Sequence, residues 1–161
     1  MDLRRLRAGE WIAALSGVTL LVSLFLPWYG DGSDGDASGW EALAAVDIAL
    51  ALVAAFGVSL LVITAAQGVP AVPVALSAIV TLVGPIGVLL VLIRIADTPG
   101  GFDGRELGIW LGLPATIGIT AGAVLAMRDE RLSPDGTHTD TSGRPVPPPP
   151  EIDRIPAPRA E

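Results

Sequence analysis

Long stretches without a charged side chain dominate the pattern of hydrophobic and polar positions along this chain. Residues 11–30, 48–93 and 107–127 contain no Asp, Glu, Lys or Arg, and these runs are 20, 46 and 21 residues long. An α-helix rises about 1.5 Å per residue and the hydrocarbon core of a bilayer is about 30 Å thick, so about 20 residues make one span. The first and third runs therefore each predict one membrane-spanning helix.

The middle run is long enough for two spans. Gln67, Gly68 and Pro70 lie near its midpoint and combine a polar side chain, a flexible residue and a helix breaker where a turn is needed. The pattern thus predicts four helices, near residues 9–29, 44–66, 70–94 and 108–127. We expect an all-α membrane protein in which residues 9–131 form a four-transmembrane-helix bundle.

The composition agrees with a chain that folds in lipid. Hydrophobic residues make up 51% of the 161 residues and charged residues only 17%, so the bilayer itself is the expected partner of the outer helix faces. Cysteine is absent. Its absence excludes disulfides, thiolate metal sites and a cysteine nucleophile.

The ten basic residues, all arginines, predict how the bundle is oriented. Three precede the first predicted span and five follow the fourth, whereas only Arg94 and Arg105 lie at the other end. Because Lys and Arg near span ends are retained in the cytoplasm, we expect a multi-pass protein of the cell membrane with both termini cytoplasmic. Residues 1–8 then form a cytoplasmic N-terminus, and the acidic segment between the first two spans faces outward.

The end of the chain differs in kind from the rest. Residues 132–161 hold eight prolines and few large apolar residues, so we predict a disordered cytoplasmic tail with a polyproline II stretch at 146–150. One interpretation is a docking peptide for a tail-binding protein with an aromatic-lined groove. The other is a solvated terminus without a partner.

Small residues four positions apart mark the fourth predicted span. Gly108 and Gly112 form one such step, and Gly118 and Gly122 form another. Glycine lets two helix backbones approach closely, so we interpret these four residues as helix-packing positions. The contact could lie within the bundle or between two copies in a homo-oligomer, and the pattern does not separate the two.

Ionisable residues near the span ends are the next candidates for a role, because burying a charge in the membrane is costly. Asp47 begins the second predicted span and Arg94 ends the third, which places both at the same end of the bundle. We consider an interfacial ion pair between them. Each residue also complements the dipole of its own helix, so its position alone is a sufficient explanation.

No constellation for catalysis, cofactor binding or metal binding emerges from the sequence. His138 is the only histidine, and no glycine-rich phosphate loop follows a strand. Residues 34–39 resemble the opening of a calcium loop, but Ala45 stands where the bidentate acid is required. The arginines flank spans or mix with acids, which argues against nucleic acid as a partner. We expect neither an enzyme nor a cofactor.

Aromatic and charged residues recur at the predicted span ends. The motifs are Arg7-x-Gly9-Glu10-Trp11, Leu26-Pro27-Trp28-Tyr29, Trp40-Glu41-Ala42 with Asp47, and Met127-Arg128-Asp129-Glu130. Amphipathic rings at such places are typical of the headgroup region, where we expect Trp11, Trp28, Tyr29, Trp40 and Trp110 to lie. The order of motifs over about residues 4–131 resembles small four-span membrane proteins of high-GC actinobacteria, which implies location but no activity. Claudin-like proteins are less similar, because this chain lacks their paired cysteines.

Two classes of function follow from these patterns. The leading hypothesis is a structural or interaction protein of the cell membrane, which would bind another membrane protein or a second copy of itself. The alternative is a small transporter, a channel or an accessory subunit of a membrane complex. It would use the third and fourth spans, where Pro85 and Pro114 should kink the helices. A charged residue in the middle of a span would favour this alternative, and the sequence has none.

Overall fold

Four long helices make up most of the structure, a computed structural model that describes residues 6–30, 36–42, 45–66, 71–98, 102 and 104–129. They are α1 (Ala8–Phe25), α3 (Ala45–Ala66), α4 (Ala71–Ala96) and α5 (Leu107–Asp129). Each is long and apolar enough to cross a bilayer. The predicted four-helix membrane bundle is therefore confirmed. The turn at 67–70 and the tail at 132–161 lie outside the described residues.

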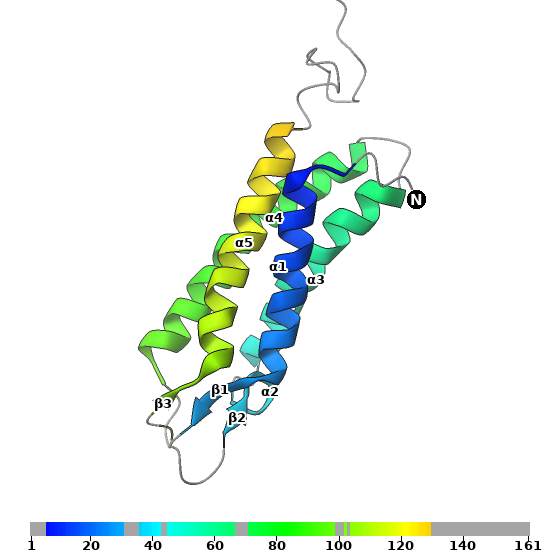
Figure 1. The fold of residues 1–161 in the computed structure, drawn as a ribbon. Helices are drawn as coiled ribbons and strands as arrows, with labels where there is room; N and C mark the ends of the chain where they lie inside the picture. Colours follow the sequence, from blue (N-terminus) through cyan, green and yellow to red (C-terminus); the bar gives the residue numbers. More distant parts are fainter. Residues whose placement is uncertain are drawn as a thin grey trace, which may run out of the picture.

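The helices run up and down the bundle in turn (Figure 1). α1 packs most extensively against α5 and then against α3, and α4 also packs against α5 and α3. Each helix thus has two main neighbours, and α1 and α4 lie diagonally across the bundle. The start of α1 and the end of α5 lie at the same end, which we call the terminal end (Figure 1).

The opposite end carries a small antiparallel sheet that the sequence pattern did not predict. β1 (Pro27–Gly30) lies between β2 (Ala37–Ser38) and β3 (Gly104–Arg105), and the short helix α2 (Gly39–Ala42) follows β2. Tyr29 pairs with Ala37 on one side and with Arg105 on the other. Because β3 belongs to the connection between α4 and α5, the sheet joins both connections at this end. We call β1, β2, α2 and β3 the sheet cap.

Proline explains why α1 ends earlier than the predicted residue 29. The helix stops at Phe25, and Leu26 has an extended backbone with φ −85° and ψ 161°. A proline disfavours helical geometry at the residue before it, so Pro27 forces the chain out of the helix at this point. The uncharged run continues to Gly30 because its last residues belong to a buried strand rather than to the span.

The core has two parts. One lies within the helices and includes Leu20, Val53, Leu60, Val80 and Ile119; the other lies at the sheet-capped end and includes Leu24, Trp28, Tyr29, Leu50, Val91 and Ile109. Large apolar side chains such as Phe25 and Leu82 are exposed on the outer faces. Exposure of this kind is expected where lipid, and not water, surrounds the helices.

Candidate functional site: the sheet cap

Trp28 joins the sheet cap to the bundle. Its side chain is fully buried, and its indole N–H donates a hydrogen bond to the carbonyl oxygen of Ser23 at 2.7 Å. The ring lies on the glycine step of α5: a Cβ added to Gly112 would be 3.0 Å from Cζ2 of the indole, and one added to Gly108 would overlap Cδ1. An aromatic ring, and not a second helix, therefore occupies the space that these two glycines leave.

The second glycine step of α5 faces α1. A Cβ added to Gly122 would lie 2.5 Å from the backbone nitrogen of Ala13 and 2.7 Å from the carbonyl oxygen of Gly9. A Cβ added to Gly118 would meet the hydroxyl of Ser16. Gly118 and Gly122 thus have neighbours within the same chain, where α1 and α5 approach each other closely.

Tyr29 attaches the sheet cap to the end of α4. The side chain is fully buried, and its hydroxyl donates a hydrogen bond to the carbonyl oxygen of Arg94 at 2.9 Å. The ring stacks on Phe102, with a centroid distance of 5.8 Å and an interplanar angle of 26°. Burial raises the pKa of Tyr29, and the nearby guanidinium groups of Arg94 and Arg105 offset only part of that effect. The hydroxyl therefore stays protonated and can donate at neutral pH.

Further hydrogen bonds hold the connection between α4 and α5 to β1 and to the end of α4. The backbone N–H of Glu106 donates to the carbonyl oxygen of Trp28 at 2.9 Å. The Nε–H of Arg105 donates to the carbonyl oxygen of Ile95, near the end of α4, at 2.6 Å. β1 is therefore held by side chains toward the helices and by backbone groups on both of its edges.

The short helix α2 begins with a local capping arrangement. The carboxylate of Glu41 accepts hydrogen bonds from the backbone N–H of Ser38 at 2.9 Å and from its hydroxyl at 2.8 Å. These two bonds, the backbone one first, lower the pKa of Glu41. The Ser-x-x-Glu spacing of Ser38 and Glu41 is a known signature of a helix start, so this cap could have been predicted from the sequence. In α2, Trp40 lies beside Phe25 of α1, with ring centroids 5.7 Å apart.

The expectation that Trp28 and Tyr29 are headgroup anchors is wrong, because both side chains are fully buried. Trp11, Trp40 and Trp110 are exposed, at 44%, 37% and 53% of their surface, as residues at a membrane surface should be. The difference has a physical cause. Among the described residues, Trp28 lies against a glycine face and has a carbonyl oxygen that accepts its N–H, which explains its burial.

The two charged candidates both lie at the sheet-capped end. Asp47 is buried in the first turn of α3, and its carboxylate accepts a hydrogen bond from the backbone N–H of Ile48 at 2.6 Å. Arg94 is half-buried in the last turn of α4, where its charge acts on Tyr29. The ion pair between Asp47 and Arg94 stays a prediction.

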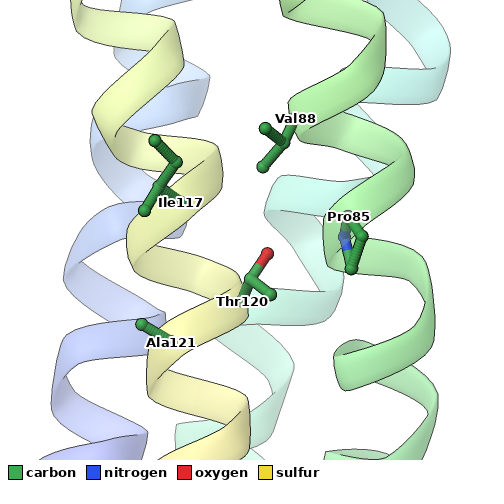
Figure 2. A pocket seen from close by; sticks show the side chains of 5 residues that line it. All are labelled: Pro85, Val88, Ile117, Thr120 and Ala121. Carbon is green, nitrogen blue, oxygen red and sulfur yellow. The ribbon is translucent and has the colours of Figure 1, made fainter.

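An open apolar groove lies between α4 and α5 (Figure 2). It has a volume of about 320 Å³ and is lined by Pro85 and Val88 of α4 and by Ile117, Thr120 and Ala121 of α5. The hydroxyl of Thr120 donates to the carbonyl oxygen of Thr116 at 3.0 Å. The groove therefore presents mainly carbon atoms to whatever occupies it.

Within the part of the chain that the structure describes, no group of three His, Cys, Asp or Glu side chains could hold a metal ion. Comparisons with protein-family models, with curated proteins and with solved structures found no match to this chain. The fold alone therefore indicates what kind of protein this is. It is a multi-pass membrane protein with four helices and a buried-aromatic sheet cap at one end.

Proposed function

We propose that the protein is a structural or interaction protein of the cell membrane, whose bundle holds the sheet cap at the outer face as a docking surface for another protein. The observation that supports this proposal is the attachment of the cap. Trp28 and Tyr29 are fully buried, and the three strands come from both connections at that end. A surface that is already ordered loses little conformational entropy when a partner binds, so such a cap is suited to docking.

The arginine distribution supports an outward-facing cap. Eight of the ten arginines come before residue 8 or after residue 127 in the sequence, whereas Arg94 and Arg105 lie at the sheet-capped end. Because the chain has no cysteine, a single-cysteine variant reports on one position. A membrane-impermeant maleimide added to intact cells should label Asp36→Cys and leave Ser142→Cys unlabelled. Labelling of Ser142→Cys alone would reverse the proposed orientation.

The docking role is tested by site-specific photo-crosslinking in cells. A photoreactive amino acid at Ala37, in β2, should give one protein adduct, and the same group at Ala55, an exposed position on α3, should not give that adduct. The adduct should be lost in Trp28→Ala, which removes the side chain that attaches the cap. The proposal fails if Ala37 gives no adduct, or if the adduct also forms from Ala55 or survives in Trp28→Ala.

The tail provides a second proposed docking element. Residues 132–161 lie outside the described residues, so the proposal is based on their proline-rich sequence alone. An affinity pull-down from native membranes should be compared between the full chain and a chain that ends at residue 131. A partner that needs the tail, but does not need Trp28, would assign that interaction to the tail and not to the sheet cap.

A small transporter, a channel or an accessory subunit is the alternative function, and the groove beside Pro85 favours it. Interrupted helices line the substrate sites of many transporters, but α4 and α5 continue through Pro85 and Pro114. Also against it, the hydroxyl of Thr120, which lines the groove, and that of Thr116, one turn earlier in α5, donate hydrogen bonds to carbonyl oxygens of their own helix. Flux of small ions and solutes should be measured in liposomes that contain the purified protein. Flux equal to that of empty liposomes agrees with the docking proposal, and a saturable flux supports the alternative.

A further inference from the structure

One face of α4 has no partner within the chain. The exposed residues of α4 lie on one stripe, opposite Ser77, Gly84 and Val91, which are buried in the bundle, and α4 has the smallest buried share of the four helices. Exposed apolar residues recur along this stripe in alternating steps of three and four, which is the spacing of the a and d positions of a heptad repeat. They are Val72, Ala75, Ile79, Leu82, Ile86, Leu89 and Ile93. We call these residues the α4 seam.

The kinds of residue in the α4 seam are sorted by position. The a positions, at 72, 79, 86 and 93, all hold Val or Ile, whereas the d positions hold Leu82, Leu89 and Ala75. In parallel coiled coils, β-branched residues at a with Leu at d favour two strands. The repeat continues for three heptads, about the length at which it becomes a sign of a helix–helix contact. The surface therefore has the residue order of a two-stranded helical dimer.

The other three helices show that exposure to lipid does not by itself produce this order. Each of them also exposes a stripe with three- and four-residue steps, as a helix that is buried on one side does. The positions that correspond to a hold Pro114 and Ala121 in α5 and Leu52 in α3, and those that correspond to d hold Trp11 and Phe25 in α1. Lipid tails require only apolar side chains, so the sorting on α4 points to a more specific neighbour.

The dimensions of the α4 seam suit a reversible contact in the membrane. From Val72 to Ile93 it extends about 32 Å at about 1.5 Å per residue, which matches the hydrocarbon thickness of about 30 Å. With a width of about 10 Å, the contact would cover about 320 Å² on each copy. This is less than the roughly 800 Å² per partner that is usual in water. Because the bilayer already fixes the orientation of both copies, less entropy is lost on association and a smaller contact can suffice.

We propose that the α4 seam binds a second copy of this chain, in a dimer whose two-fold axis is perpendicular to the membrane. Two copies with the same orientation can place their α4 helices parallel and in register, so that a positions meet a positions and d positions meet d positions. A different partner would have to supply the same residue order. The glycine steps of α5 are covered within the chain, so they do not compete for this role. The dimer is independent of the docking role of the sheet cap.

The first test compares two leucines with the same exposure. Leu89 in the α4 seam and Leu52 on α3 are both 57% exposed, so Leu89→Ala and Leu52→Ala are matched changes. Energy transfer between copies labelled at Ser142→Cys is measured in liposomes at decreasing protein-to-lipid ratios. The unmodified α4 seam and Leu52→Ala should give the same dimer-to-monomer transition, and Leu89→Ala should need a several-fold higher ratio. A chain that is monomeric at every ratio, or equal transitions in both variants, would overturn the proposal.

The second test exchanges the residue order but keeps the composition of the α4 seam. The variant carries Ile79→Leu, Leu82→Ile, Ile86→Leu and Leu89→Ile, and all four side chains are exposed in the bundle. Leu at a with Ile at d favours more than two strands. Single-molecule photobleaching in liposomes should count two copies for the native order, and fewer dimers with larger assemblies for the exchanged order. The same count for both orders would refute the proposal, because a face that contacts only lipid does not distinguish them. Circular dichroism checks the helices, and the comparison of Leu89 with Leu52 decides the matter if the fourfold variant does not fold.

Discussion

The contact between Trp28 and the glycine face of α5 makes a prediction in which one substitution has opposite effects in two backgrounds. A Cβ added to Gly112 points at the indole, with Cζ2 at 3.0 Å and Cη2 at 3.1 Å. Gly112→Leu should therefore destabilise the native chain, because the new side chain and the ring compete for the same space. In a Trp28→Ala background the same leucine should stabilise the protein, because it enters the space that the indole left.

The magnitudes follow from the packing. Overpacking a filled site costs up to about 3 kcal/mol, and replacing a glycine within a helix returns about 1 kcal/mol, so Gly112→Leu should cost about 2 kcal/mol. Trp28→Ala should cost about 3–5 kcal/mol, since the side chain is fully buried. The carbonyl oxygen of Ser23 adds little to this cost, because it also accepts the N–H of Leu26 at 3.1 Å. Refilling the cavity with leucine should recover about 2 kcal/mol.

The assay is reversible unfolding in mixed micelles with increasing SDS, followed by circular dichroism. The four proteins of the double-mutant cycle are measured together with Val124→Leu, a partly lipid-exposed control that should change stability by less than about 0.5 kcal/mol. The cycle gives the coupling energy between Trp28 and Gly112. If Gly112→Leu has the same effect with and without the indole, the ring does not lie on this glycine.

Three further predictions concern single positions. Burial raises the pKa of Tyr29 above 10.0, so its contribution to stability is complete below that pH and is lost as the pH rises through the folded-state pKa. Tyr29 is the only tyrosine, so tyrosinate absorbance reports its midpoint directly, and an unshifted midpoint would contradict its burial. Hydrogen bonds from Ser38 lower the pKa of Glu41, so the contribution of Glu41 to stability is present above pH 4.5 and is lost as the pH falls through its folded-state pKa. Carbon-13 NMR should show a titration midpoint below 4.5 for this carboxyl group. Glu41→Gln should remove the part of the stability loss at low pH that the Glu41 carboxyl group causes. Gly122→Ala should lower stability more than Gly118→Ala in the SDS assay. The Cβ added at Gly122 meets backbone atoms of α1, whereas the Cβ added at Gly118 meets the hydroxyl of Ser16, which can rotate away. Equal losses of stability would argue against the close α1–α5 contact.

The helices could be predicted from the sequence because the bilayer imposes a length on every span. A run of about 20 uncharged residues has few alternatives in lipid, and the four observed helices lie within a few residues of the predicted ones. The end of α1 was misplaced because charge alone defined the run. Pro27 carries the missing information, since it ends the helix although the hydrophobicity continues.

The sheet cap could not be predicted in the same way. Its strands have four, two and two residues, too few to show an alternating pattern. Tyr29 pairs with Arg105, and Trp28 lies on Gly112, so both contacts join segments that are far apart in the chain. A tryptophan at the end of a span has the same local sequence whether it faces headgroups or a glycine step. The neighbouring helix decides which of the two occurs.

The claim on which the account depends most is that Trp28 holds the sheet cap rigidly to the bundle. Pulsed EPR between spin labels at Asp36, beside β2, and Val18, on the outer face of α1, measures this directly in lipid nanodiscs. We expect one narrow distance distribution in the native background and a clearly broader one in Trp28→Ala. A distribution that is already broad with Trp28 present, or a narrow one that Trp28→Ala leaves unchanged, would contradict the account.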